Sequence, residues 1–206
     1  MDYVFTHGTG TEADPYQVWT AEDLDGVRDY LDAHFIQMAD IDLSVYENWE
    51  PIGTSGTPFE GIYDGNGHKI DNLTINRPTE NNIGLFAVLS ISETHDFSSV
   101  PTATIKNLGI TNVNVSGAEN VGGLTGGILN SSTVSNCYST GSVSGDRCVG
   151  GLVGFIWFSA VYSCYSANSV SGADYIGGLI GLNHYHSTTS NCYSTSNVSG
   201  QMELVV

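Results

Sequence analysis

The stretch Val149-Gly150-Gly151-Leu152-Val153-Gly154 decides the fold, because the sequence contains it three times at nearly constant spacing. The other copies begin at Val121 and Ile176, which lie 28 residues before and 27 residues after Val149. Two further phrases recur in the same order with the same spacing. The phrase built on Cys-Tyr-Ser occupies residues 136–139, 163–166 and 191–194. The phrase Val-Ser-Gly occupies residues 143–145, 170–172 and 198–200. A fixed period of this length indicates units that cannot bury a face alone and therefore stack.

The composition of the repeat predicts short strands. The unit is rich in Val, Ile, Tyr, Ser, Thr and Gly, has no helical stripe of apolar residues and contains no proline. Each phrase is a run of about four to six residues bounded by Gly, Ser or Asn, which is the pattern of a strand and a turn. Three such strands per unit fit one coil of a parallel β-solenoid, with coils about 4.8 Å apart. A propeller blade needs four antiparallel strands in about 40 residues, so the unit is too short for one.

The charge of the chain narrows the classes of partner. The 206 residues include 5 Lys and Arg against 22 Asp and Glu, which gives a net charge of −17. This charge repels nucleic acid and anionic lipid and argues against polyanionic substrates. It suits a solvated extracellular surface, although simple solubility explains it equally well.

The sequence predicts no membrane insertion, because no apolar run approaches the roughly 20 residues of a membrane span. The opening Met1-Asp2-Tyr3-Val4 has neither the basic nor the apolar region of a signal peptide. If the protein is secreted, we expect its leader to have been removed before this numbering begins.

The cysteines predict buried packing. Cys137, Cys164 and Cys192 hold one position of the repeat, which is neither a paired disulfide framework nor a Cys-x-x-Cys metal pattern. Because free cysteine behaves as a small hydrophobe, we expect a cysteine ladder inside the solenoid. Cys148 instead precedes a strand and is predicted to be an exposed turn thiol.

Three leucines, three valines and three asparagines also recur at fixed positions. We expect the leucines to stack in the core and the valines to share the inward face of the cysteines, which they follow by an even step of six residues. We expect the asparagines at a bend, where Asn tolerates left-handed backbone. The residues are Leu124, Leu152 and Leu179; Val143, Val170 and Val198; and Asn107, Asn136 and Asn191.

Three tyrosines form the main candidate binding feature. Tyr138, Tyr165 and Tyr193 directly follow the cysteines, so strand alternation turns them outward. We expect a stripe of stacked rings about 4.8 Å apart. Packing between neighbouring coils and a platform for sugar rings are both open interpretations of this stripe.

The chain divides into three parts of one continuous solenoid, namely an N-terminal cap in residues 1–50, irregular coils in residues 51–120 and regular repeats in residues 121–206. In the cap, Thr20 is a predicted N-cap with Asp23 three residues later, and the apolar spacing predicts a helix over 21–31. We expect this helix to cover the open end of the first coil, whose strand edges would otherwise recruit other chains.

The middle part contains weaker copies of the repeat. Residues 83–86 (Ile-Gly-Leu-Phe) resemble a first copy of the Gly-Gly-Leu phrase, and Ile105-Lys-Asn-Leu108 aligns with Val134-Ser-Asn-Cys137. Leu108 therefore fills the cysteine position. The segment from Ser92 to Thr102 is predicted to be a loop extruded from one corner.

These phrases, in this order, resemble the GLUG-motif repeat proteins, which are bacterial and archaeal surface or secreted proteins, often large and adhesin-like. The resemblance implies a right-handed parallel β-helix exported to the cell surface, with no defined catalytic residues. The family is also found attached to peptidases, but the sequence contains no protease motif. Besides the Gly-Gly-Leu repeats, the resemblance rests on residues 13–16, 39–43, 49–53, 59–68 and 105–109.

The sequence contains no common catalytic motif: His-Glu-x-x-His, Gly-x-Ser-x-Gly, the P-loop and Cys-x-x-Cys are all absent. Two histidines, His184 and His186, are spaced to share one face of a strand. Sister repeats carry Ile156 and Phe158 nearby, which favours a local surface feature over a zinc site.

One acidic segment resembles the start of a calcium loop, at Asp40-x-Asp42-x-Ser44. Val45 and Pro51 replace the Gly and Glu that an EF-hand requires, which excludes that motif. A looser calcium site that uses Asp40, Asp42 or Asp64 stays open, beside the default interpretation of turn-forming aspartates. We expect no other cofactor.

We therefore expect a non-catalytic extracellular module that acts as a rod or adhesion scaffold, with other protein chains or cell-surface glycans as partners. A carbohydrate-binding or glycan-active β-helix module and a self-assembling fibre subunit remain as alternatives. Polysaccharide lyases share the fold, but those that act on polyuronates need basic residues beside calcium. The coils offer only four, which are scattered along the rod: Lys69, Arg77, Lys106 and Arg147.

The end of the sequence predicts self-association. After Gly200 the apolar position of the repeat falls on Leu204, and Val205-Val206 replace the expected glycines. Repeat arrays normally carry a polar cap, and an uncovered coil exposes unpaired backbone groups. We expect the C-terminal coil to be buried against another chain or against further sequence, with an end-to-end contact as one form.

Overall fold

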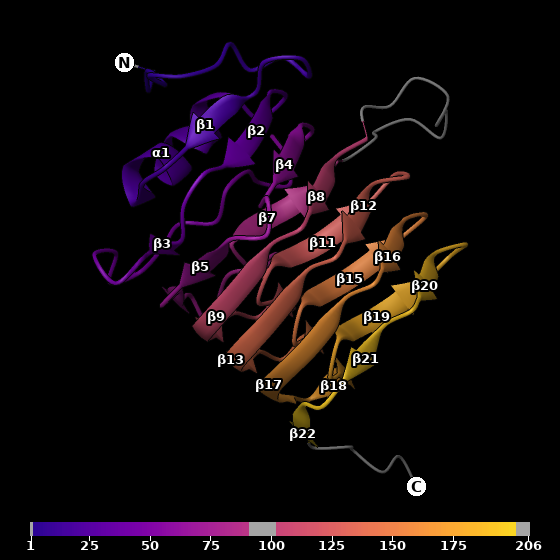
Figure 1. The fold of residues 1–206 in the computed structure, drawn as a ribbon. Coiled ribbons are helices and arrows are strands. Elements are labelled where there is room, and N and C mark those ends of the chain that lie inside the picture. Colours follow the sequence, from indigo (N-terminus) through magenta and orange to yellow (C-terminus); the bar gives the residue numbers. More distant parts are fainter. Residues whose placement is uncertain (1, 91–101, 201–206) are drawn as a thin grey trace, which may run out of the picture.

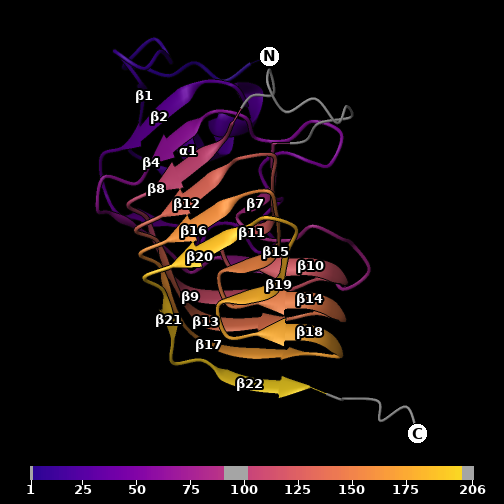
Figure 2. The same cartoon turned by 90° about the vertical axis from the view of Figure 1, so that its right-hand side faces the viewer.

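The computed structural model describes residues 2–90 and 102–200, and these form one parallel β-solenoid with a short helix at the N-terminal end (Figures 1 and 2). All strand pairs between neighbouring coils are parallel, as the repeat predicted. Figure 1 shows the coils stacked along one axis, from indigo to yellow. The segment expected to be an extruded loop lies almost entirely outside the described residues.

The first sheet contains a strand from successive coils along the whole stack. Its strands, in order, are β1 (Tyr16–Val18), β2 (His34–Gln37), β4 (Ile62–Asp64), β8 (Thr104–Lys106), β12 (Thr133–Ser135), β16 (Ala160–Tyr162) and β20 (Thr188–Ser190).

The second sheet contains the longest strands, β9 and β17. Its strands are β3 (Ile41–Asp42), β5 (Lys69–Asp71), β9 (Gly109–Ser116), β13 (Tyr138–Ser144), β17 (Tyr165–Gly172) and β21 (Tyr193–Ser194), while β6 (Thr74–Asn76) pairs with β9 and β22 (Asn197–Gly200) pairs with β17.

Two smaller sheets meet at the Gly-Gly-Leu phrase. The third sheet consists of β7 (Phe86–Leu89), β11 (Thr125–Leu129), β15 (Val153–Trp157) and β19 (Ile180–His184). The fourth consists of β10 (Glu119–Gly122), β14 (Arg147–Gly150) and β18 (Asp174–Gly177).

The register follows the sequence repeat. Val149 pairs with Val121 on one side and with Ile176 on the other. The weaker copies also align as predicted, because Ile83 bridges to Val121 and Ile105 pairs with Val134.

The bends between the first and second sheets carry left-handed backbone. Asn107, Asn136 and Asn191 have φ values of 55°, 52° and 53°, so the predicted bend is confirmed. Ser163 holds the same position with φ of 55°. The Asn136 Nδ2 group donates to Asn107 Oδ1 at 3.1 Å, which links neighbouring coils through the side chains.

Three glycines of the repeat make a tight corner between β14 and β15, which we call the glycine corner (residues 149–154 and the equivalent residues of the other copies). A Cβ atom on Gly154 would lie 2.5 Å from the backbone nitrogen of Val121 and 2.6 Å from the carbonyl carbon of Asn120. A Cβ atom on Gly151 would collide with Oγ of Ser166, and one on Gly150 with a carbonyl oxygen. Backbone therefore packs directly on backbone here.

The helix α1 (Ala21–Gly26) is shorter than predicted and continues only as a 3₁₀ turn, η1 (Val27–Asp29). The ring of Tyr3 packs on Gly26, where a Cβ atom would collide with it. The predicted N-cap at Thr20 is confirmed, and it forms a capping box with Asp23. Asp23 N–H donates to Thr20 Oγ1 at 3.1 Å, and Thr20 N–H donates to Asp23 Oδ2 at 3.0 Å. Leu24 and Val27 are fully buried in the core.

Substitution of Gly154 tests the glycine corner. Gly154→Ala should destabilise the protein by about 1–3 kcal/mol, because backbone atoms of the neighbouring coil cannot move aside cheaply. The control is Gly127→Ala in β11, whose Cβ atom would find its nearest neighbour, Leu129 Cδ1, at an ordinary 3.4 Å. Urea unfolding should separate the two variants, and equal stabilities would contradict the close backbone contact.

Substitution of Thr20 tests the helix cap. Thr20→Ala removes the side-chain acceptor of the Asp23 N–H and should cost about 1 kcal/mol of stability. Thr20→Ser keeps the hydroxyl group and should retain most of the stability. Chemical denaturation measures both, and an Ala variant as stable as the Ser variant would argue against the cap.

Candidate functional site

The tyrosine stripe is present, with its rings stacked face to face along the second sheet. The Tyr138 and Tyr165 centroids lie 4.8 Å apart with planes 3° from parallel, and the Tyr165 and Tyr193 centroids lie 5.1 Å apart at 6°. The ring of Tyr138 in turn covers Gly109, where a Cβ atom would come within 2.6 Å of its Cε1. Both faces of Tyr165 are thus occupied.

This stacking limits what the stripe can bind. A sugar ring packs on an open aromatic face, and among the three tyrosines only the outer face of Tyr193 has no stacked ring of the stripe on it. Tyr193 is 60% exposed, whereas Tyr138 and Tyr165 are half-buried. The geometry therefore supports packing between coils for most of the stripe.

The cysteine ladder contributes hydrogen bonds as well as volume. The Cys137 N–H donates to Cys164 Sγ at 3.4 Å, and the Cys164 N–H donates to Cys192 Sγ at the same distance. All four cysteines are free thiols, and burial raises the pKa of the Cys137 thiol. The ladder thus satisfies backbone donors at the bend and lacks the exposed, electropositive surroundings of a reactive cysteine.

The leucine and valine positions also stack. Leu124 N–H donates to the Leu152 carbonyl, and Leu152 N–H donates to that of Leu179, both at 2.9 Å. Val170 pairs with Val143 and with Val198. Leu179, Cys192 and Val198 are less buried than their partners, because they belong to the last described coil.

The prediction for Cys148 was wrong, because this residue is buried with only 6% of its surface exposed. Its backbone is left-handed, with φ of 53°. The glycine corner of the next coil packs directly on it, since a Cβ atom on Gly181 would lie 2.5 Å from the Cys148 carbonyl carbon. Burial raises the pKa of the Cys148 thiol.

The three aspartates considered for calcium each bind protein donors. Asp40 Oδ1 accepts from the Lys69 N–H at 3.1 Å, and Asp42 Oδ1 accepts from Asn72 Nδ2 at 2.9 Å. These hydrogen bonds hold the pKa of both carboxyl groups below the usual range.

Asp64 is also committed to protein contacts. Burial opposes its ionisation, but hydrogen bonds from Asn107 and from the Asn66 N–H outweigh burial and lower its pKa. Within residues 2–90 and 102–200, no three His, Cys, Asp or Glu side chains are placed to hold a metal ion. The structure does not bring the three aspartates together as a metal centre.

A concave surface lies next to the glycine corner in the repeats, and we call it the Tyr175 groove. It has a volume of about 470 Å³. Residues from β10, β14 and β18 line one side and residues from β15 and β19 the other, principally Glu119, Arg147, Tyr175, Phe155, Leu182 and His184.

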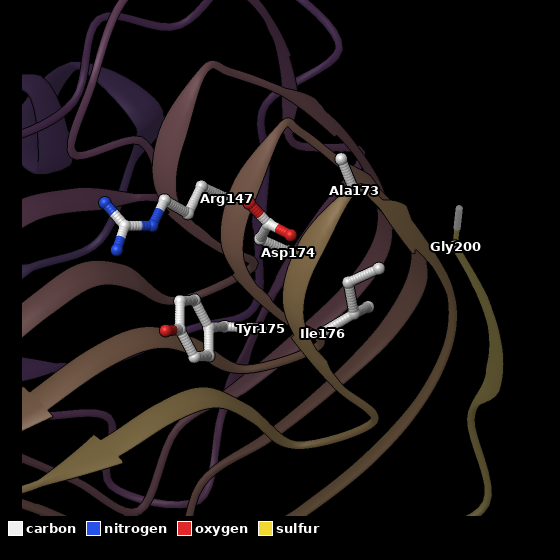
Figure 3. Close-up of a pocket in the computed structure, with 6 residues that line it drawn as sticks. All are labelled: Arg147, Ala173, Asp174, Tyr175, Ile176 and Gly200. Carbon is white, nitrogen blue, oxygen red and sulfur yellow. The ribbon is translucent and has the colours of Figure 1, made fainter. Parts of the chain in front are cut away.

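Arg147 and Tyr175 form a ridge at the edge of this groove. The Arg147 guanidinium lies over the Tyr175 ring, 5.2 Å from its centroid, and Figure 3 shows the two side chains extending in the same direction. A second hollow of about 600 Å³, lined by Asp174 and Ile176 among others, also includes both side chains (Figure 3). The ridge therefore stands between two hollows.

Beyond His184 the surface continues into the turn after the third sheet, which carries Phe158 in one coil and Tyr185 and His186 in the next. We call it the aromatic turn. Trp157 pairs with His184 between β15 and β19, and the Phe158 and Tyr185 rings that follow stack 6.2 Å apart. The His186 ring lies 5.3 Å from that of Phe158. The two histidines do not share a strand face as predicted, because β19 ends at His184 and His186 is in the turn.

The backbone of this turn is strained. Phe158, Tyr185 and His186 have φ values of 50°, 34° and 48°. Bulky residues rarely adopt left-handed backbone, at a cost of about 1–3 kcal/mol each. The equivalent turn of the earlier coil uses Asn130 and Ser131, which adopt this conformation more readily.

The sequence does contain a signal for the groove, namely two repeat positions at which the residue type changes from coil to coil. Asn120 occupies the position that Cys148 and then Tyr175 occupy in later coils, and Gly127 occupies the position of Phe155 and Leu182. Tyr175 in the last described coil is larger than Asn120 and Cys148 at the same position, and Phe155 and Leu182 replace a glycine. Departures from the repeat, rather than the repeat itself, mark this site.

Sequence comparisons find two related proteins. The chain is 41% identical over 133 residues to a "Putative Gly-rich membrane protein" of Evansella cellulosilytica, which covers 60% of this chain and 14% of that protein. It is 34% identical over 159 residues to "Halomucin" of Haloquadratum walsbyi, which covers 71% of this chain and 2% of that protein. The chain thus spans a small part of the length of both relatives. Among the described residues, no helix is long and apolar enough to cross a bilayer.

A solved structure shares the fold. It is the crystal structure of a "putative immunoglobulin A1 protease" from Bacteroides ovatus, with a TM-score of 0.54 and 20% sequence identity over 95% of this chain and 80% of that one. At this identity the likeness shows the fold alone.

The family comparison bears directly on the repeat. Residues 117–144 and 172–199 both match the family described as the GLUG motif. Each match begins just before a glycine corner and ends in the Val-Ser-Gly phrase. The chain therefore carries the GLUG motif at two sites, which agrees with the resemblance that its ordered phrases predicted.

Proposed function

We propose that the chain is a non-catalytic module of a surface protein and acts as an extracellular rod or adhesion scaffold. The observation that carries this proposal is a single core that runs from Phe5 to Val170, with Ile176, Leu179, Ile180 and Cys192 of the last described coil packed against it. Stacked repeats of this kind give an elongated body whose length grows with the number of coils. The match to the GLUG motif and the name of the membrane-protein relative support placement at a cell surface.

The distribution of charge supports a scaffold over an enzyme. Sixteen of the 22 acidic residues lie within residues 1–80, whereas the regular coils from 121 to 200 contain only Asp146, Arg147 and Asp174. Enzymes need titratable groups that act together in a pocket. In the Tyr175 groove these are limited to Glu119, Arg147, Cys148, Tyr175 and His184.

The non-catalytic part of the proposal has a direct test. The purified chain, incubated with a panel of neutral and acidic polysaccharides and unfolded proteins, should release neither reducing sugar nor new N-termini. Glu119→Gln and His184→Ala serve as matched variants. Turnover that copurifies with the chain and disappears in either variant would overturn the proposal.

End-to-end assembly is a second candidate, favoured by the exposure of the last described coil. Val198 in β22 is 45% exposed, although Val143 and Val170 in the same ladder are each 1% exposed. Figure 2 shows β22 at the outer end of the stack. An identical repeat from a second copy could continue the parallel sheets and cover these apolar positions.

Assembly can be tested by light scattering over a wide range of protein concentration. The parent chain should increase in mean mass as concentration rises, and Val198→Lys should shift this increase to higher concentration, because it places a charge on the contact. Ser142→Lys, at an exposed position of an inner coil, is the control. A mean mass that stays at that of one chain throughout would exclude self-association through this coil.

A further inference from the structure

We propose that the Tyr175 groove binds a neutral saccharide chain. The groove combines a partly exposed aromatic ring, Tyr175, with apolar and hydrogen-bonding side chains in one concave surface. Its volume of about 470 Å³ lies within the range of small-molecule sites. This inference goes beyond the scaffold role and does not depend on it.

The aromatic component is Tyr175, which is 51% exposed at the boundary of two hollows. The Arg147 guanidinium lies over the ring and holds it in place through a cation–π contact. No ring of a described residue stacks on Tyr175, unlike Tyr165 in the stripe. A pyranose ring can therefore pack its apolar face on this tyrosine.

The apolar floor and the polar groups complete the site. Phe155 and Leu182 are neighbours on one side of the groove, and both are half-buried. Glu119 can accept hydrogen bonds from sugar hydroxyl groups, and the exposed His184 side chain can donate or accept. A few polar groups around an aromatic surface are the usual means of orienting a ligand.

The strained aromatic turn extends this surface in line with the groove. Tyr185 is 59% exposed, and its ring packs against His184 at 4.4 Å between centroids. A left-handed conformation is unfavourable for Phe158, Tyr185 and His186, and strain of this kind concentrates at functional sites. The turn would contact a second sugar unit of a chain that lies along the groove.

The charges select against an acidic sugar. Glu119 and Asp174 flank the single cation Arg147, whose guanidinium is already placed over Tyr175. The chain as a whole carries a net charge of −17. A uronate or sialylated chain would thus approach a negative surface with no unengaged cation in the groove.

A peptide fits the groove less well than a saccharide. Peptides commonly bind by adding a strand to an exposed sheet edge. The strands that line the groove in the inner coils have no such edge, since β14 is paired with β10 and β18, and β15 with β11 and β19. Specific backbone pairing is therefore not available at β14 and β15, and a strand could be added only at the outer strands β18 and β19.

The test begins with an array of neutral and acidic oligosaccharides and continues with calorimetry on the strongest neutral hit. Tyr175→Ala should weaken binding by about tenfold, as expected for loss of one aromatic stacking contact. Tyr175→Phe should keep most of the affinity, because it retains the ring. Tyr162→Ala, at a partly exposed tyrosine of the first sheet, should bind like the parent.

Each outcome decides the question. No binding to any neutral saccharide, or binding unchanged in Tyr175→Ala, overturns the proposal. Loss of binding in Tyr193→Ala alone would instead assign the ligand to the stripe, and preference for acidic sugars would overturn the charge argument. Melting temperatures confirm that each variant is folded. None of these results bears on the scaffold role, which fails only if catalytic turnover is found.

Discussion

The solenoid depends on the direct contact of backbone with backbone at the glycine corner. Gly150 faces a carbonyl oxygen of its own turn, Gly151 faces the Ser166 hydroxyl group, and Gly154 faces the backbone of the previous coil. The three glycines are therefore required for three different reasons. Because the corner joins two sheets within each coil, a side chain there would move both sheets and disturb the register that all coils share.

Short polar side chains form hydrogen bonds with buried polar groups around this corner. Asn168 Nδ2 lies within hydrogen-bonding distance of Ser139 and Ser166 Oγ and of the Gly151 carbonyl, and Ser196 Oγ donates to the Gly178 carbonyl. The cysteine sulfurs accept hydrogen bonds from backbone N–H groups at the bend. Small polar residues in the repeat thus supply hydrogen bonds where the coil turns, with Asn168 Oδ1 left buried without a partner, and apolar residues fill the space between.

The sequence predicted those features that follow from the repeat or from local rules, and missed those that depend on contacts between coils. The period, the Asn107 bend and the Thr20 cap followed from local rules of strand, turn and helix chemistry. The burial of Cys148 did not, because it results from contact with the next coil at Gly181. The groove depends on residues from three coils, Glu119, Arg147 and Tyr175 among them, and on the approach of two sheets. Alternation and the repeat predicted the outward-facing stack of tyrosine rings, and the structure adds that Tyr138 also covers Gly109.

The aromatic turn also explains the unequal spacing of the repeat. Three residues separate β11 from β12 and β19 from β20, whereas Phe158 and Ser159 alone separate β15 from β16. The repeat therefore gains or loses a residue at this turn while the four sheets stay in register. Because the turn accepts a change in length without a change in sheet register, it is a suitable place for inserted segments. Segments of different length and sequence, grafted there coil by coil, would be displayed in a row at the spacing of the strands, about 4.8 Å.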